Sequence, residues 1–175
     1  MGYMASGKST LGRALAERLG RQFVDLDRLI EERHGMPVPR IIAERGESAF
    51  RLLESTALKS TVKLKNVVVA CGGGTPCFRD NMEFMSLHGL TLWLVASPER
   101  IVERLCSPDA APRPLVAGKS GDELLDFVKS HLMRRQHFYN RALWRIDSDS
   151  LESASDIDAT IRDFLTLSGL KPNSN

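Results

Sequence analysis

Short apolar runs and helical periodicities alternate along this chain. The runs predict strands over residues 23–25, 67–70, 92–95 and 144–146, because a segment that is apolar at nearly every position suits a strand buried on both faces. Apolar spacings of three and four predict helices between these runs. The predicted helices cover residues 8–19, 27–34, about 38–44, 47–62, 79–88, 98–105, 122–141 and 155–168, with Asp122 as the cap of the seventh. This alternation favours the α/β class, with a three-layer arrangement around a parallel sheet.

The chain length and the breaks in the pattern predict one domain. A single core is expected over residues 1–170, followed by a frayed tail at 171–175. Residues 107–120 lose periodicity and contain three prolines, which suits a mobile lid better than a rigid core element.

Composition narrows the class of partner. The net charge of +2 comes from 24 basic and 22 acidic residues that are interleaved, so a nucleic-acid partner is not expected. No apolar run approaches the ~20 residues of a membrane helix, and residues 1–25 show no signal-peptide pattern. Three cysteines without paired or metal-ligand spacing suggest reduced thiols. We expect a cytoplasmic monomer that acts on small molecules.

The strongest motif lies at residues 2–9, which read Gly-Tyr-Met-Ala-Ser-Gly-Lys-Ser and match the phosphate-binding loop Gly-x-x-x-x-Gly-Lys-Ser/Thr. In such a loop the backbone N–H groups and the following helix N-terminus surround phosphates, and the lysine reaches the β and γ phosphates. The hydroxyl of Ser9 is a candidate Mg²⁺ ligand. The alternative is a chance glycine-rich turn before a helix. The predicted ATP phosphate contacts are Ala5, Ser6, Gly7, Lys8, Ser9 and Thr10.

A phosphate-binding loop is expected to follow a buried strand, yet here the loop occupies the first residues of the sequence. We therefore expect an upstream strand that this sequence does not contain, and the alternative is a protein that dispenses with one. The guanine-reading Asn-Lys-x-Asp motif and the Leu-Ser-Gly-Gly-Gln signature are both absent, which argues against GTPases and ABC-type ATPases. A small-molecule kinase remains.

Several charged residues suit the second substrate of a kinase. Asp25 and Asp27 follow a predicted strand, where open α/β sheets bind ligands, and alternation sends them in different directions. Arg51 and Arg135 can each grip a carboxylate with two hydrogen bonds, although a solvated helix face is the alternative for any single arginine. Asp27 could instead cap the next helix. Three glycines at 72–74 permit close backbone approach, and the N–H of Gly73 is a candidate substrate contact.

Together these segments resemble the shikimate kinase family. The resemblance lies in the loop, Asp25-Leu26-Asp27, residues 45–54, Gly72-Gly73-Gly74, Arg113-Pro114-Leu115 and the interval from Arg135 to Tyr139. It implies a substrate-binding segment at about 26–54 and phosphorylation of the shikimate 3-hydroxyl by MgATP, a step toward aromatic amino acids.

The same resemblance implies roles for individual residues. Asp25 would hold Mg²⁺ through water, and Asp27 would accept hydrogen bonds from substrate hydroxyls and assist proton removal. Arg113 on the lid would contact both substrates, and Arg104 would pack near adenine, close to the segment 147–150. The predicted catalytic residues are Lys8, Asp27 and Arg113, and the predicted substrate-binding residues are Asp27, Arg51, Gly73 and Arg135.

Two residues depart from the family pattern. Ala5 stands where the family usually has glycine, and a methyl group fits there if the residue keeps a negative φ. Cys71 stands where a hydroxyl residue is common, and a thiol is a poorer hydrogen-bonding group. A gluconate or nucleoside-monophosphate kinase, or a non-catalytic nucleotide-binding protein, remains the alternative reading.

Overall fold

The computed structural model describes residues 1–108, 110 and 113–172 and has an α/β fold with parallel strands. Strand β1 (Gln22–Asp25) pairs in parallel with β2 (Val67–Ala70), and β3 (Leu92–Val95) pairs in parallel with β4 (Trp144–Asp147). All four strands lie where the apolar runs predicted them. The predicted tail residues 173–175, and positions 109, 111 and 112 of the predicted lid, lie outside the described residues.

Seven α-helices connect and cover the strands in the described part of the chain. They are α1 (Lys8–Arg18), α2 (Leu26–His34), α3 (Val38–Ser60), α4 (Asn81–His88), α5 (Pro98–Cys106), α6 (Gly121–Tyr139) and α7 (Ala154–Ser168). The two helices predicted between residues 38 and 62 follow each other directly and together make α3. A kink at Gly46, whose φ of 81° and ψ of 160° are not helical, separates them. Asp122 was wrongly predicted as the cap of α6, because that helix begins one residue earlier and Ser120 is the capping position.

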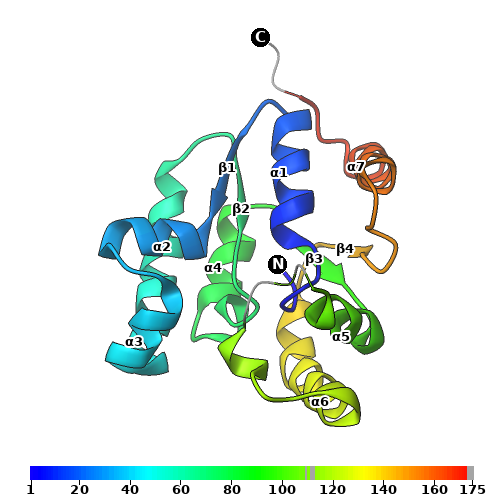
Figure 1. Ribbon diagram of the computed structural model, residues 1–175. Coiled ribbons are helices and arrows are strands. Elements are labelled where there is room, and N and C mark those ends of the chain that lie inside the picture. The colour runs from blue at the N-terminus through cyan, green and yellow to red at the C-terminus, as the bar shows by residue number, and fades with distance from the viewer. Residues whose placement is uncertain (109, 111–112, 173–175) are drawn as a thin grey trace.

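The helices form layers on both faces of the strands (Figure 1). On one face, α1 and α7 pack on β3 through Leu11, Leu15 and Phe164. On the other face, α2, α3, α4 and α6 contribute a larger cluster. That cluster includes Leu26, Ile30, Ile41, Phe50, Leu58, Met82, Trp93 and Tyr139. Burial of these apolar side chains supplies the main favourable free energy of folding. The arrangement confirms the predicted three-layer α/β fold.

The strands form two separate pairs, because among the described residues no strand joins β2 to β3. The chain begins between these two strands (Figure 1). There the α-ammonium group of Met1 donates to the Leu92 carbonyl at 2.6 Å, and the Leu94 N–H donates to the Met1 carbonyl at 2.9 Å. The loop at residues 2–7 therefore starts from the carboxyl-terminal part of β3.

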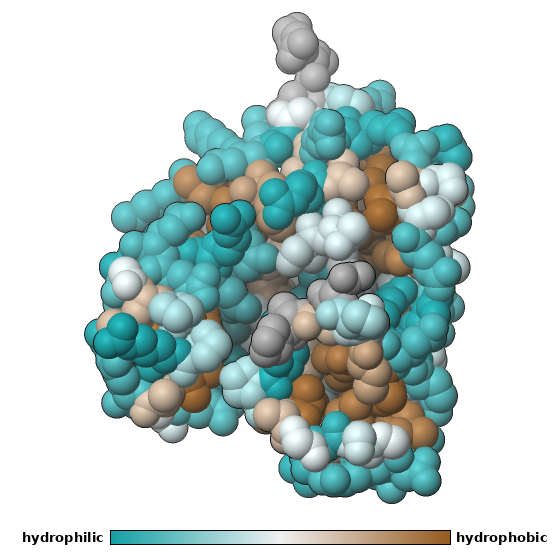
Figure 2. Space-filling view, viewed as in Figure 1, coloured by the Kyte–Doolittle hydropathy of each residue, from teal (hydrophilic) through white to brown (hydrophobic). Residues whose placement is uncertain are grey.

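No helix within residues 1–108 and 113–172 is long and apolar enough to cross a membrane. The surface has a hollow between a lobe formed by α2 and α3 and a lobe formed by α5 and α6 (Figure 2). The site residues predicted from the sequence come from both lobes and from the loop between them.

Candidate active site

The glycine-rich loop curls directly into the N-terminus of α1. Gly7 has a φ of 84°, in the left-handed region that glycine adopts without steric cost. The Lys8 ammonium group donates to the Tyr3 carbonyl at 2.6 Å, so the loop folds back over its own lysine. Burial lowers the pKa of Lys8 to about 8, and the positive charge of Arg113 acts in the same direction. A phosphate brought to this loop would meet a concentrated positive field.

Ala5 is the strained position of the loop. Its φ is 59°, so the negative φ at which a methyl group would fit without strain is not adopted. An L-residue in the left-handed region costs roughly 1–2 kcal/mol because Cβ approaches the following carbonyl oxygen. The loop therefore keeps the glycine-like backbone and carries the cost of a methyl group.

Replacing Ala5 with glycine is expected to stabilise the protein. Relief of roughly 1–2 kcal/mol of strain exceeds the roughly 0.4–1 kcal/mol by which glycine raises the entropy of the unfolded chain. The net gain in free energy of unfolding is about 0.5–1 kcal/mol, measured by urea denaturation. Ala16→Gly is the matched control, since Ala16 lies inside α1 and its replacement should destabilise. Equal destabilisation by both substitutions would contradict the strain at Ala5.

Ser9 and Asp25 form the corner of the site that suits a divalent cation. The Ser9 hydroxyl donates to Asp25 Oδ2 at 2.8 Å, and Asp25 Oδ1 accepts from the Asp27 N–H at 3.1 Å. Asp25, and not Asp27, is thus the carboxylate that caps α2. The described residues contain no group of three or more His, Cys, Asp or Glu that could hold a metal ion alone. One hydroxyl and one carboxylate fit Mg²⁺, which keeps several waters and binds substrate phosphates.

A cavity of about 330 Å³ opens beside the loop and is large enough for part of a nucleotide. Its lining includes Ala5, Gly7, Lys8, Ser9, Thr10, Arg104, Arg113 and Leu151. Five of the six predicted phosphate contacts are in this set, and Ser6 is the sixth, fully buried beneath the loop. Arg113 is exposed at the mouth of the cavity.

Arg104 joins the loop to the segment predicted near adenine. Its guanidinium donates to the carbonyls of Ser148 at 2.6 Å, Asp149 at 3.2 Å and Ala5 at 3.3 Å. Since its donors bond to backbone carbonyls, Arg104 holds the segment 148–151 against the loop. Its guanidinium could then contact a base only by stacking with its flat face. Contact of Arg104 with adenine stays a prediction, and its hydrogen bonds to these carbonyls are a finding of the structure.

Asp27 lies in the first turn of α2, where the phosphate-binding loop meets the lobe formed by α2 and α3. Burial raises its pKa to about 6, and the negative charges of Glu54 and Asp25 reinforce the shift. The positive charges of Lys8 and Arg113 oppose it. A carboxylate with a pKa near 6 is ionised at neutral pH and can still accept a proton, which is the requirement for a general base.

Arg51 is held in place by two carboxylates on its own helix, α3. Its guanidinium donates to Glu54 Oε2 at 2.7 Å and to Glu47 Oε1 at 3.0 Å. Glu54 is fully buried, and its other carboxylate oxygen accepts from the Thr75 hydroxyl. The Glu54 contact raises the pKa of Arg51 despite the opposing effect of burial, so the guanidinium stays charged. The charge-assisted bonds fix one edge of Arg51 and leave its remaining donors for a ligand.

The glycine triplet lies between the two predicted substrate arginines. A Cβ added to Gly74 would lie 2.6 Å from the Arg51 guanidinium carbon, and one added to Gly73 would lie 3.2 Å from Arg135 Nη1. A side chain at Gly74 would therefore displace the Arg51 guanidinium, and one at Gly73 would crowd Arg135. The buried hydroxyl of Tyr139 donates to the Gly73 carbonyl at 2.6 Å, one turn of α6 after Arg135. The fold thus brings Arg51, Gly73 and Arg135 to one place.

Two residues that support this place, Thr75 and Tyr139, were not predicted from the sequence. Thr75 orients Glu54, and Tyr139 holds the Gly73 peptide group, although Tyr139 served only as a landmark for choosing Arg135. No spacing along the chain reveals these contacts, because each joins segments at least 21 residues apart. Cys71 is buried, and burial raises the pKa of its thiol, in agreement with an unreactive group.

Sequence comparison identifies the relatives of this chain. A family model described as shikimate kinase matches residues 4–166. A shikimate kinase from Bacteroides thetaiotaomicron is 42% identical over 161 residues, which cover 92% of this chain and 91% of that protein. A shikimate kinase from Phocaeicola vulgatus is 43% identical over the same length and covers the same shares.

Comparison of folds agrees with the sequences. The crystal structure of shikimate kinase from Bacteroides thetaiotaomicron superposes with a TM-score of 0.91 at 41% identity, over 97% of this chain and 96% of that one. The enzyme from Acinetobacter baumannii, solved in complex with shikimate, gives a TM-score of 0.82 at 29% identity, over 96% and 90% of the two chains. The family match spans most of the chain and includes every predicted site residue from Ala5 to Arg135. This chain belongs to the shikimate kinase family.

Proposed function

We propose that this protein transfers the γ-phosphoryl group of ATP to the 3-hydroxyl of shikimate. One observation carries the proposal: Lys8 of the phosphate-binding loop and Glu54, the carboxylate that holds Arg51, both act on the carboxyl group of Asp27. The positive charges of Lys8 and Arg113 lower the pKa of Asp27, and the negative charge of Glu54, the partner of Arg51, raises it. This arrangement suits an anionic alcohol beside a nucleotide.

On the nucleotide side, residues 5–10 would bind the phosphates through backbone N–H groups and the Lys8 ammonium group. Ser9, with Asp25 acting through water, would hold the Mg²⁺ that accompanies ATP and neutralises charge on its phosphates. A phosphate bound at this loop would favour the charged form of Lys8, against the effect of burial. Arg113 would supply a second positive charge to the transferring group.

On the acceptor side, Arg51 and Arg135 would grip the carboxylate of shikimate, which places its ring beside Gly73. The N–H of Gly73 would donate to the substrate. Asp27 would accept hydrogen bonds from the substrate hydroxyls and take up the proton as the 3-hydroxyl attacks phosphorus. Most of the rate acceleration in such a reaction comes from alignment and charge neutralisation.

One chain supplies every side chain in this proposal, so we expect a monomer. The reaction consumes ATP and requires Mg²⁺, both of which the cytoplasm supplies, and we expect the protein to act there.

A coupled ADP-release assay with MgATP tests the proposed function. The purified chain is given shikimate, gluconate or AMP, and ADP formation is expected to depend on shikimate alone. Dehydroshikimate, which keeps the carboxylate and lacks the attacking alcohol at carbon 3, is the matched control and should inhibit without being phosphorylated. Turnover with gluconate or AMP and none with shikimate would overturn the proposal.

A further inference from the structure

The two arginines that meet at the glycine triplet are held in different ways. Arg51 forms ion pairs with Glu47 and Glu54. No ion pair between described residues includes Arg135. The guanidinium carbon of Arg135 lies instead over the ring of Tyr3, 5.6 Å from the ring centre. Tyr3 belongs to the phosphate-binding loop, so a residue of the nucleotide side contacts an arginine of the acceptor side.

The Tyr3 ring is fixed by the same lobe that carries Arg135. Its hydroxyl lies 3.3 Å from His131 Nδ1, within hydrogen-bond distance, and His131 precedes Arg135 by one turn of α6. Phe127 stacks on the His131 ring, with centroids 4.6 Å apart. Tyr3 is buried and packs in a cluster with Ala96, Ile101, Leu124 and Val128. The orientation of the ring relative to α6 is therefore set by several contacts.

An aromatic face suits an arginine that has to bind an anion. The face is the negative part of the ring quadrupole, so it attracts a guanidinium without accepting its hydrogen bonds. The N–H donors lie in the guanidinium plane, and a carboxylate can accept two of them at the edge. A glutamate in the place of the ring would instead compete with the carboxylate of a substrate. Burial raises the pKa of Tyr3, and the positive charge of Arg135 opposes the rise, in agreement with their contact.

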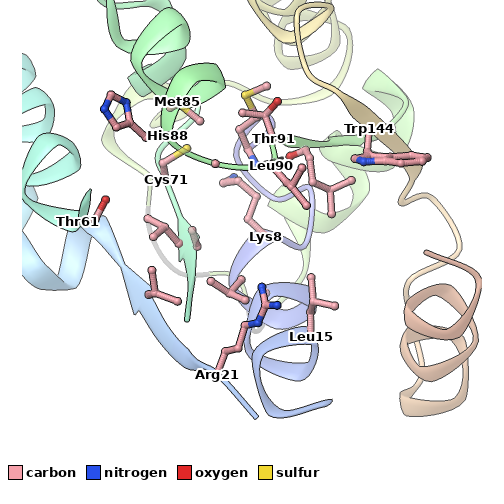
Figure 3. A pocket seen from close by; sticks show the side chains of 18 of the residues that line it. Lys8, Leu15, Arg21, Thr61, Cys71, Met85, His88, Leu90, Thr91 and Trp144 are labelled. Atoms are coloured by element: carbon pink, nitrogen blue, oxygen red, sulfur yellow. Dashed lines mark hydrogen bonds between the residues drawn. The ribbon is translucent and has the colours of Figure 1, made fainter. Parts of the chain in front are cut away.

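The backbone of Tyr3 has a separate contact on the nucleotide side. Lys8 extends from the first turn of α1 (Figure 3), and its ammonium group donates to the Tyr3 carbonyl at 2.6 Å. A substitution of the side chain at residue 3 leaves this carbonyl in the chain. The contact with Lys8 and the contact with Arg135 can therefore be separated by substitution.

From these contacts we propose that Tyr3 is a positioning residue for the acceptor substrate, whose ring holds the Arg135 guanidinium with its edge free to grip a carboxylate. The inference rests on the proposed function, because it takes the carboxylate of shikimate as the ligand of Arg135. It gives a residue of the phosphate-binding loop an effect on the affinity for shikimate. A residue that only supported the loop would change the affinity for the nucleotide.

The test is calorimetric titration of the full chain with shikimate alone and with MgADP alone, which measures both dissociation constants without turnover. Tyr3→Leu removes the ring, and Tyr3→Phe keeps it. Tyr3→Met, whose flexible side chain adapts to irregular space, is a second variant without the ring, so the result does not depend on one variant that folds. Phe23→Leu is the matched control, because it removes a ring that lies 5.2 Å from the Arg13 guanidinium carbon and has no place in the proposed site.

Tyr3→Leu and Tyr3→Met are expected to raise the Kd for shikimate about 5- to 30-fold, the range that corresponds to the loss of a partly desolvated cation–π contact. Tyr3→Phe should restore the Kd for shikimate to within about threefold of the unsubstituted protein, since phenylalanine keeps the aromatic face. The Kd for MgADP should stay within about threefold in all of these variants, and Phe23→Leu should change neither constant.

Three outcomes would contradict the inference, and they point to different causes. If the unsubstituted chain binds shikimate and the two variants without the ring bind it equally well, the inference is overturned and the proposed function stands. Equal losses of affinity for shikimate and MgADP would also overturn it, because Tyr3 would then act through the loop as a whole. No binding of shikimate to the unsubstituted chain would overturn the proposed function and the inference with it.

Discussion

Replacing Arg113 with alanine is expected to lower kcat by about 10³-fold or more and to leave Tm within about 2 °C. Arginines that neutralise a transferring phosphoryl group contribute about 10³–10⁵ in rate. Arg113 lies at the mouth of the nucleotide cavity and its charge reaches both Lys8 and Asp27. It is exposed, and exposed side chains usually change the free energy of unfolding by less than about 0.5 kcal/mol. Steady-state ADP release and thermal melts measure the two effects.

Two variants sharpen the Arg113 result. Arg113→Lys keeps the positive charge and loses the planar guanidinium, which can make two parallel hydrogen bonds. A kcat between those of the unsubstituted protein and Arg113→Ala would show how much the second hydrogen bond adds to the charge. Arg141→Ala removes another exposed arginine, outside the cavity, and should leave kcat unchanged. Losses of activity and thermal stability in proportion to each other would mean that Arg113 acts through the fold and not at the reaction.

The secondary structure was predictable where one local rule decided it. The runs at 67–70 and 92–95 are apolar at every position and suit only burial on both faces, and the structure has strands with those bounds. The break predicted between the helices at about 38–44 and 47–62 is confirmed by the non-helical backbone of Gly46. The prediction of Asp122 as the cap was wrong because α6 begins at Gly121, which makes Ser120 the N-cap residue, although its side chain makes no capping hydrogen bond.

The residues that carry the chemistry of the candidate site could be predicted from the sequence, whereas the residues that hold them in place could not. A motif placed Lys8 and Ser9, and family resemblance placed Arg51 and Arg135, which the structure brings to the glycine triplet. The left-handed φ of Ala5 could not be read from the residue type, since alanine normally avoids that region. Tertiary contacts such as Tyr139 to Gly73 depend on packing between α6 and the triplet, which no local pattern contains.

The second large effect is expected at Asp27, where asparagine keeps the size of the side chain and removes the base. We expect Asp27→Asn to lower kcat by about 10²–10⁴-fold, the usual contribution of a positioned general base. In the unsubstituted protein, kcat/KM for shikimate should fall as pH drops through about 6, because the proton-accepting form is lost at the pKa of Asp27. Initial rates between pH 5 and 8 measure both effects.

The same substitution should stabilise the protein, with a pH dependence of defined sign. The folded pKa of Asp27, about 6, lies above the ordinary aspartate pKa of 3.8, so the folded state binds the proton more tightly than the unfolded state. Stability from this group is complete below pH 3.8 and is lost as pH rises through 6. At pH 8 the ionised carboxylate therefore costs up to about 3 kcal/mol, and at pH 5 about half of that.

Asp27→Asn should accordingly raise Tm more at pH 8 than at pH 5, while activity falls at both. Asp163→Asn, which replaces an exposed carboxylate on α7, is the matched control and should change neither Tm nor kcat. If the variant is inactive and gains the same Tm at both pH values, the raised pKa of Asp27 does not explain the gain in stability. A variant that retains kcat within threefold would show that the acceptor hydroxyl loses its proton elsewhere. An inactive variant stabilised mainly at pH 8 would mean that the protein keeps a destabilising charge at Asp27 because the phosphoryl transfer needs it.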